Sequence, residues 1–157
     1  MPLARSSLFT LAALFAAACS TAPLTRNDNL VVPGKRVGEV EIGMSLADLM
    51  ALKGVPQKTV PIPASAATTY IFDGLVVAAD DKVYWIIAKD QRFHTASGIA
   101  AGVEQIAARA AHGRPDCVVS KAETTVYDYG DFYFDVNNAT GKVLLLGVQD
   151  RTQNCDG

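Results

Sequence analysis

Two stretches of the chain share one pattern: GMSLADLMALKGVP at residues 43–56 and GVEQIAARAAHGRP at residues 102–115. Each begins with Gly and ends with Gly-x-Pro, and the second set of landmarks lies 59 positions after the first. Apolar residues recur at helical spacing inside the first stretch, as Leu46, Leu49 and Met50. A glycine followed closely by proline ends a helix. The pattern therefore predicts two short helices in two copies of one supersecondary unit.

The two predicted helices begin with different residues. Ser45 is a good N-cap for the first helix, with Asp48 at the third helical position. In the second stretch we expect Gly102 to cap weakly, with help from Glu104 near the positive end of the helix. His112 falls in the last turn, where positive charge is favoured.

Runs rich in β-forming residues follow each predicted helix. After the first helix they are Thr68–Phe72, Leu75–Ala79 and Val83–Ala88; after the second they are Cys117–Ser120, Thr124–Tyr129, Asp131–Val136 and Val143–Val148. Turn residues separate neighbouring runs, which favours antiparallel pairing. We therefore predict an α+β fold with two tandem repeats, each a short helix followed by an antiparallel β-sheet, at residues 37–92 and 93–157.

The start of the chain has the pattern of an export signal. Leu8–Ala18 is an apolar run of eleven residues, which is too short to span a bilayer and is typical of a cleaved signal peptide at residues 1–18. Cys19 follows directly, and this junction resembles the lipobox of bacterial lipoproteins. The resemblance implies palmitate-type acylation of Cys19 and, because Ser20 is not Asp, an outer-membrane location facing the periplasm. Ser20–Arg36 has two Pro, one Gly and many small polar residues, which predicts a flexible tether after the lipidated Cys, at residues 19–36. Ordinary cleavage that leaves Cys19 free is the alternative.

The remaining cysteines suggest a disulfide. If Cys19 carries lipid, Cys117 and Cys155 are the two left, and an oxidising compartment favours their pairing. The bond would close a loop of about 39 residues and stabilise the fold by about 4 kcal/mol. Two unpaired thiols are the alternative, and two distant cysteines without a nearby His cluster do not predict a metal site.

Residues 42–45 read Ile-Gly-Met-Ser, and a short helix and Gly-x-Pro follow them. This combination resembles the SmpA/OmlA family, which includes the BamE lipoprotein of the outer-membrane assembly machinery. The doubled unit is similar to the β-lactamase inhibitor protein fold. The resemblance covers about residues 37–150 and implies a fold unit rather than a particular activity.

Composition excludes several functions. The formal net charge is −2 with scattered basic residues, so the chain lacks the basic footprint of a nucleic-acid-binding protein. We find no Gly-x-Ser-x-Gly motif, no phosphate-binding loop and no multi-His metal pattern, so we expect neither an enzyme nor a bound cofactor or metal. The carboxylates Asp128, Asp131 and Asp135 lack the spacing of a calcium loop and are expected to be solvated on a hairpin.

Aromatic residues in the predicted strands suggest a binding surface. Tyr and Trp are typical anchors of protein interfaces. The candidate protein-binding residues are Tyr70, Tyr84, Trp85, Tyr127, Tyr129 and Tyr133. The alternative is that both sheet faces are buried between the repeats. We predict a non-enzymatic lipoprotein of the cell envelope that binds or scaffolds an envelope protein; the alternatives are an inhibitor of a periplasmic or secreted enzyme and a small-ligand carrier.

Overall fold

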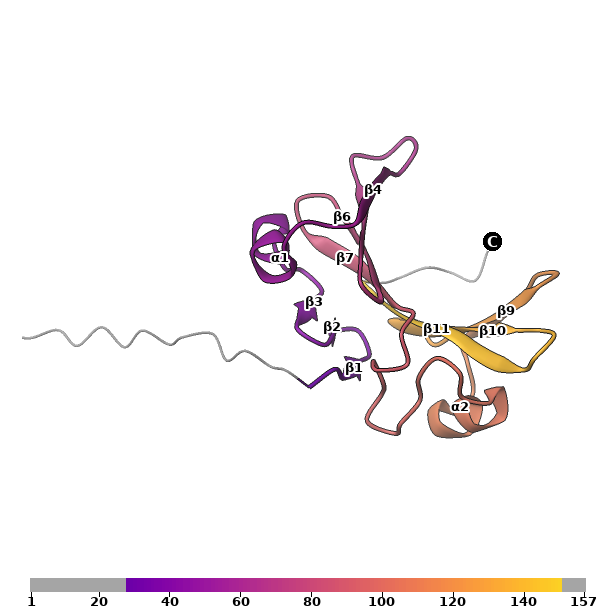
Figure 1. Cartoon of the computed structure of the whole chain (residues 1–157). Helices are drawn as coiled ribbons and strands as arrows, with labels where there is room; N and C mark the ends of the chain where they lie inside the picture. The colour runs from indigo at the N-terminus through magenta and orange to yellow at the C-terminus, as the bar shows by residue number, and fades with distance from the viewer. Residues whose placement is uncertain (1–27, 151–157) are drawn as a thin grey trace, which may run out of the picture.

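The computed structural model describes residues 28–150. Two helices and eleven strands occur within that range (Figure 1). The helices are α1 (Leu46–Lys53) and α2 (Gln105–His112). The strands are β1 (Val31–Val32), β2 (Arg36–Val37), β3 (Val40–Glu41), β4 (Lys58–Pro61), β5 (Thr68–Phe72), β6 (Leu75–Ala79), β7 (Val83–Ala88), β8 (Cys117–Ser120), β9 (Thr124–Asp128), β10 (Phe132–Asn137) and β11 (Lys142–Gln149).

One antiparallel sheet of eight strands runs through the molecule in the order β4-β5-β6-β7-β11-β10-β9-β8. Strands β7 and β11 pair at its centre, with Ile86 opposite Val148 and Ala88 opposite Leu146. The prediction of two tandem repeats, each with its own sheet, is therefore wrong: the chain is mostly β, and strands from both halves belong to one sheet. If the two halves formed separate sheets, β7 and β11 would each be an exposed apolar edge strand. Their pairing with each other removes both edges.

The core lies on one face of this sheet. The small three-stranded sheet β1-β2-β3 and both helices lie on the same side of the large sheet (Figure 1). They contribute Val37, Val40, Leu49 of α1 and Ala108 of α2, all fully buried. The large sheet contributes alternate residues of its strands, which is the pattern of a sheet with one covered face. These are Leu75, Val77, Ile86, Phe132, Phe134, Val136, Leu146 and Val148.

The two helices differ at their starts. The Ser45 hydroxyl accepts a hydrogen bond from the Asp48 backbone N–H at 3.1 Å, which confirms the predicted cap of α1. At α2 the N-cap is Glu104, and its side chain makes no capping hydrogen bond, so the expectation for Gly102 is wrong. Gly102 instead donates its backbone N–H to the Val143 carbonyl at 2.7 Å, which holds the segment before α2 against β11.

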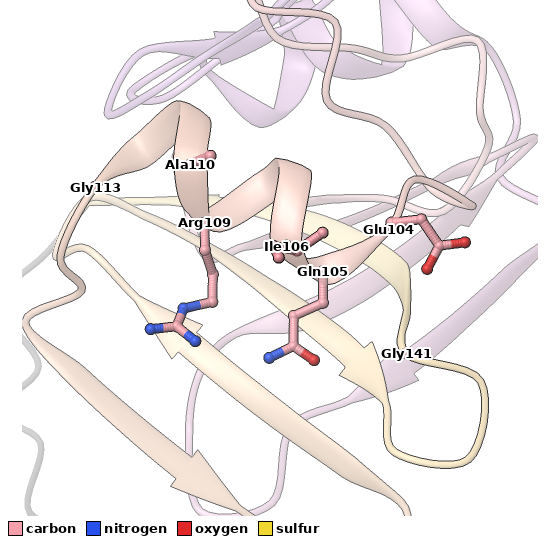
Figure 2. Close-up of a pocket in the computed structure, with 7 residues that line it drawn as sticks. All are labelled: Glu104, Gln105, Ile106, Arg109, Ala110, Gly113 and Gly141. Carbon is pink, nitrogen blue, oxygen red and sulfur yellow. The ribbon is translucent and has the colours of Figure 1, made fainter.

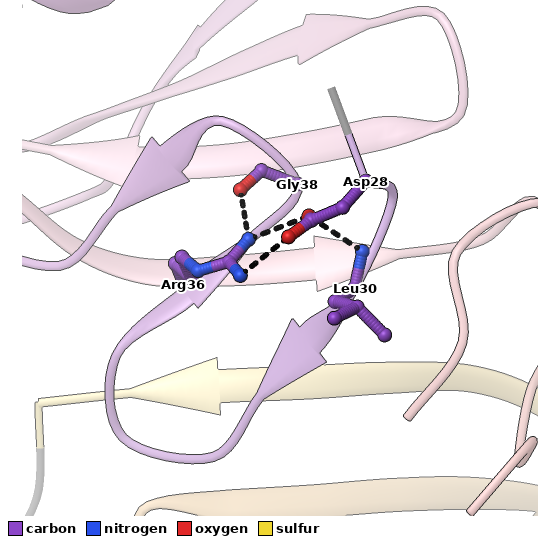
Figure 3. A network of polar contacts seen from close by, with 4 residues as sticks. All are labelled: Asp28, Leu30, Arg36 and Gly38. Atoms are coloured by element: carbon purple, nitrogen blue, oxygen red, sulfur yellow. Dashed lines mark hydrogen bonds and ion pairs between the residues drawn. The ribbon is translucent and has the colours of Figure 1, made fainter. Parts of the chain in front are cut away.

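Residues 28–45, before the first helix, form ordered structure. Arg36 is buried and its guanidinium binds both Asp28 carboxylate oxygens, at 2.7 and 2.8 Å, and the Gly38 carbonyl at 2.7 Å (Figure 3). Such a two-point pair between Arg and a carboxylate is a strong, directional contact. The predicted tether therefore contains β1 and the start of β2, which are too short to give a periodic signal in the sequence.

Several expectations fall on parts of the chain that the structure does not describe. The signal peptide at residues 1–18, the lipidated Cys19 and Cys155 all lie outside residues 28–150. Cys117 is disulfide-bonded. Its pairing with Cys155 stays a prediction. Within residues 28–150, neither helix is long and apolar enough to cross a bilayer.

Candidate functional site

The sheet divides the six candidate aromatic residues between its two faces. Tyr127 is buried in the core, and Tyr70 and Tyr129 pack against the same core. Tyr84, Trp85 and Tyr133 lie on the opposite, open face. The sequence alone does not decide whether both faces are buried; within residues 28–150 the large sheet has one covered face and one open face.

A pocket of about 540 Å³ lies on this open face, and we call it the sheet-face pocket. Its walls come from β7, β9, β10 and β11, together with Ile62 after β4, Lys121 between β8 and β9, and Asp150 after β11. The lining residues are Ile62, Tyr84, Trp85, Ile87, Lys121, Val126, Asp128, Tyr133, Asp135, Leu145, Gln149 and Asp150. The pocket thus combines apolar and aromatic walls with a few charged groups, as ligand sites do.

At the base of the pocket, the large side chain of Tyr133 lies opposite a glycine, Gly147, on the neighbouring strand. Tyr133 of β10 pairs with Gly147 of β11, which in turn pairs with Ile87 of β7. A β-carbon at Gly147 would lie 2.0 Å from Cε1 of Tyr133, so the tyrosine ring occupies the space that a side chain would take. The ring reaches Trp85 across β11, with 6.5 Å between the ring centroids and 25° between the planes.

Two polar atoms in the pocket are shielded from solvent and lack a hydrogen-bond partner among the described residues. They are Nε1 of Trp85, a donor, and Oδ1 of Asp135, an acceptor. Leaving such a group unpaired costs about 1–3 kcal/mol. Buried polar groups are nearly always paired in native proteins, so two exceptions in one pocket are evidence of a site rather than of packing alone.

Two titratable groups of the pocket, Asp135 and Tyr133, have shifted pKa values. Burial, opposed by the positive charge of Lys121, raises the pKa of Asp135 above its ordinary value. Burial, together with the negative charges of Asp135 and Asp128, raises the pKa of Tyr133 far above that of a free tyrosine. The Trp85 indole lies near enough to the Tyr133 hydroxyl to oppose this rise, although no well-formed hydrogen bond joins them.

The aromatic residues on the covered face have a structural role. The His112 ring lies 4.7 Å from Phe132 and 5.7 Å from Tyr129, centroid to centroid, and its Nε2 is buried without a partner in the described part of the chain. Burial lowers the pKa of His112, so its ring is held neutral rather than charged, contrary to the role expected from its place in the last turn. These contacts dock the end of α2 onto the sheet.

A second hollow lies beside α2 (Figure 2). Arg109 and Gln105 extend from the same side of the helix in this view. Gln105 donates a hydrogen bond to the Tyr127 hydroxyl, and the Arg109 guanidinium lies 5.4 Å from the centre of the Tyr127 ring. Because its polar side chains already have partners within the chain, this hollow is a weaker candidate than the sheet-face pocket.

Sequence reasoning found the aromatic residues of the site but missed its carboxylate. Asp135 was expected to be solvated, whereas it is partly buried and carries one enclosed, unpaired oxygen. Its position between Phe134 and Val136, in a run of alternating core residues, placed it on the opposite face. The sequence does not show which strands lie beside β10. In the structure these are β9 and β11, and residues of both line the pocket around Asp135.

No protein-family model and no curated protein sequence matches this chain. Solved structures that share its fold include two bacterial proteins. A cysteine-rich secretory protein from Staphylococcus aureus matches with a TM-score of 0.51 and 17% identity over 78% of this chain and 48% of that one. An extracellular protein containing a SCP domain, from Bacillus anthracis, matches with a TM-score of 0.50 and 11% identity over 69% of this chain and 44% of that one.

These comparisons correct the expected family. The matching structures are a cysteine-rich secretory protein and a protein with a SCP domain, so the resemblance to the SmpA/OmlA family and to BamE is not upheld. At 11–17% identity they show a shared fold, and this chain spans about half the length of each. One is described as a secretory protein and the other as an extracellular protein.

Proposed function

We propose that this protein is a non-enzymatic binding module of the cell envelope that holds a segment of a protein partner on the open face of its large sheet. The observation that carries the proposal is the sheet-face pocket, in which Tyr84, Trp85 and Tyr133 gather on a face that the helices leave open. Tyr and Trp provide large contact area with a polar end, which suits an interface.

The unpaired groups support a peptide-like occupant. An indole N–H needs an acceptor and a carboxylate oxygen needs a donor, and a polypeptide segment offers both through its backbone and side chains. Trp85 of β7 and Asp135 of β10 belong to one continuous sheet, with β11 between their strands, so both side chains are positioned by the sheet and not by a loop. Preformed sites bind without the cost of ordering a loop.

A photo-crosslinking experiment tests this proposal. Tyr84→p-benzoylphenylalanine places the crosslinker at the sheet-face pocket, and Ile106→p-benzoylphenylalanine places it on α2, where Ile106 is 80% exposed. In cells of the source organism we expect position 84 to crosslink one partner that position 106 does not, and Trp85→Leu to reduce that product. Identical products at both positions, or none at position 84, would overturn the proposal.

We also propose that acylated Cys19 holds the module at the outer membrane, facing the periplasm. The support is the eleven-residue apolar run that ends directly before Cys19. More than one acyl chain gives stable membrane attachment. Cys19→Ala is expected to abolish incorporation of labelled palmitate and to move the protein out of the membrane fraction. Label that persists in the variant would refute the anchor.

A further inference from the structure

Resting on the proposed binding face, we propose that the sheet-face pocket takes an arginine side chain from the bound protein segment. In this arrangement Asp135 is the counter-ion of the guanidinium, and the Trp85 and Tyr133 rings form the wall on which it stacks. The partner must therefore present a guanidinium group to the sheet-face pocket. Its support comes from the pocket's charge, its aromatic wall and its unpaired carboxylate.

The first support is charge. The charged residues that line the pocket are three carboxylates, Asp128, Asp135 and Asp150, and one ammonium group, that of Lys121. Asp128 is already engaged, since its Oδ1 accepts the Gly130 backbone N–H at 2.7 Å. No ion pair between Lys121 and Asp135 forms in the part of the chain that the structure describes. The pocket is therefore negative and lacks a direct partner for Asp135.

The second support is the aromatic wall. The Trp85 and Tyr133 rings are within 25° of parallel, and the face of an indole is the most favourable aromatic surface for a cation. The same chain uses this contact elsewhere, because Arg92 lies 5.0 Å from the Phe93 ring centre and Arg109 lies 5.4 Å from that of Tyr127. Among the residues of 28–150 that line the pocket there is no arginine that already occupies this wall.

The third support is the state of Asp135 itself. Its Oδ1 is enclosed without a donor, and partial burial raises its pKa, so its charge is poorly compensated in the free protein. A guanidinium carries five N–H donors in a planar fork and binds a carboxylate at two points while stacking on a ring. It thus meets both requirements of the pocket. A lysine ammonium is a more strongly hydrated point charge and meets them less well.

The test uses the only tryptophan of the protein, Trp85, as its reporter. The probe is N-acetylarginine amide, and N-acetylcitrulline amide is its uncharged analogue of nearly the same shape. Titration of the full chain with the arginine probe is expected to change Trp85 emission with a Kd on the order of millimolar, as suits so small a ligand. Citrulline is expected to bind at least tenfold more weakly.

Two variants locate the effect. Asp135→Asn keeps the shape of the side chain and removes its charge, and we expect it to weaken arginine binding at least fivefold. Glu39→Gln, a carboxylate beside the small sheet and outside the sheet-face pocket, is the matched control and should leave binding unchanged. Arg151 follows Asp150 in the sequence, so the titrations are repeated with Arg151→Gln to remove a cation of the chain itself as a competitor.

The arginine inference would be overturned if the arginine probe bound neither the wild type nor Arg151→Gln. It would also be overturned if the arginine and citrulline probes bound equally well. An Asp135→Asn variant that is folded by circular dichroism and binds like the wild type would overturn it as well. If the crosslink at position 84 persists in these cases, the protein-binding face stands and only the cation preference fails. If the crosslink is also absent, the proposed function itself fails.

Discussion

Tyr133 can form the base of the sheet-face pocket only because the residue opposite it on β11 has no side chain. The backbone of Gly147 is not in the left-handed region, so the glycine is required for space and not for conformation. Its absent β-carbon would lie 2.0 Å from the tyrosine ring. Gly147 is therefore a residue of the site, although its sequence neighbourhood, LLLGVQ, reads as an ordinary buried strand.

Gly147→Ala is expected to destabilise the fold by about 1–3 kcal/mol, because the tyrosine ring must leave its place or the strands must separate. Urea denaturation of the wild type and the variant measures the change. Tyr133→Ala in the Gly147→Ala background removes the ring that clashes, so the alanine at position 147 should cost much less there. An equal cost in both backgrounds would show that the contact between Tyr133 and Gly147 is not the reason for the glycine.

At the scale of elements, the two helices have the same length and different caps. Ser45→Ala removes the hydroxyl that accepts the Asp48 N–H and is expected to cost about 1 kcal/mol. Glu104→Ala at the start of α2 removes no capping bond, only an exposed ion pair with Lys142 at 3.6 Å, and should cost less than about 0.5 kcal/mol. Chemical denaturation of both variants compares them, and equal losses would contradict the assigned caps.

The packing of α2 on the sheet should depend on pH through His112. Burial lowers the pKa of His112 in the folded protein below its unfolded value of about 6.5, so the unfolded chain binds the proton more readily. Stability is therefore expected to fall as pH drops below 6.5. His112→Phe fills the same place without a titratable group and should lose less stability between pH 7.5 and 5.5. Parallel pH profiles in thermal unfolding would rule out this role.

Individual elements were more predictable from the sequence than their arrangement. The runs Thr68–Phe72, Leu75–Ala79 and Val83–Ala88 form β5, β6 and β7 with the expected bounds, because alternation and turn residues are local signals. Strand β4 was missed, since its exposed residues give no apolar pattern. The pairing of β7 with β11 was also missed, because residues some 60 positions apart carry no local sign of contact.

The candidate site shows the same limit. Alternation along β10 puts Tyr133 on the face opposite Phe132 and Phe134 in the structure, but alternation alone does not tell which face the helices cover. Tyr127 was therefore grouped with Trp85 although the two lie on opposite faces. The pocket that holds Asp135 combines residues of β10 with residues of β7, β9 and β11, which only the assembled sheet brings together.

At the scale of the whole molecule, the β7–β11 pair joins two halves that would otherwise be separate. Strand β11 carries two leucines of different exposure: Leu146 is 0% exposed in the core, and Leu144, at the bulge where the register of β10 and β11 shifts, is 39% exposed. Leu146→Ala is expected to cost about 2–5 kcal/mol through lost burial and a cavity, whereas Leu144→Ala should cost less than about 1 kcal/mol. Similar losses for both would contradict the location of the core.

Because β7 and β11 share one continuous sheet and one core, the two halves should unfold together. Trp85 emission reports on β7 and the pocket, while far-ultraviolet circular dichroism reports on the backbone of the whole chain. In urea the two signals are expected to give one coincident transition in the wild type, and Leu146→Ala should shift both midpoints equally to lower urea. A Trp85 transition that separates from the circular dichroism signal would mean that one half unfolds alone, and the β7–β11 pair would then not be the contact that makes the sheet one unit.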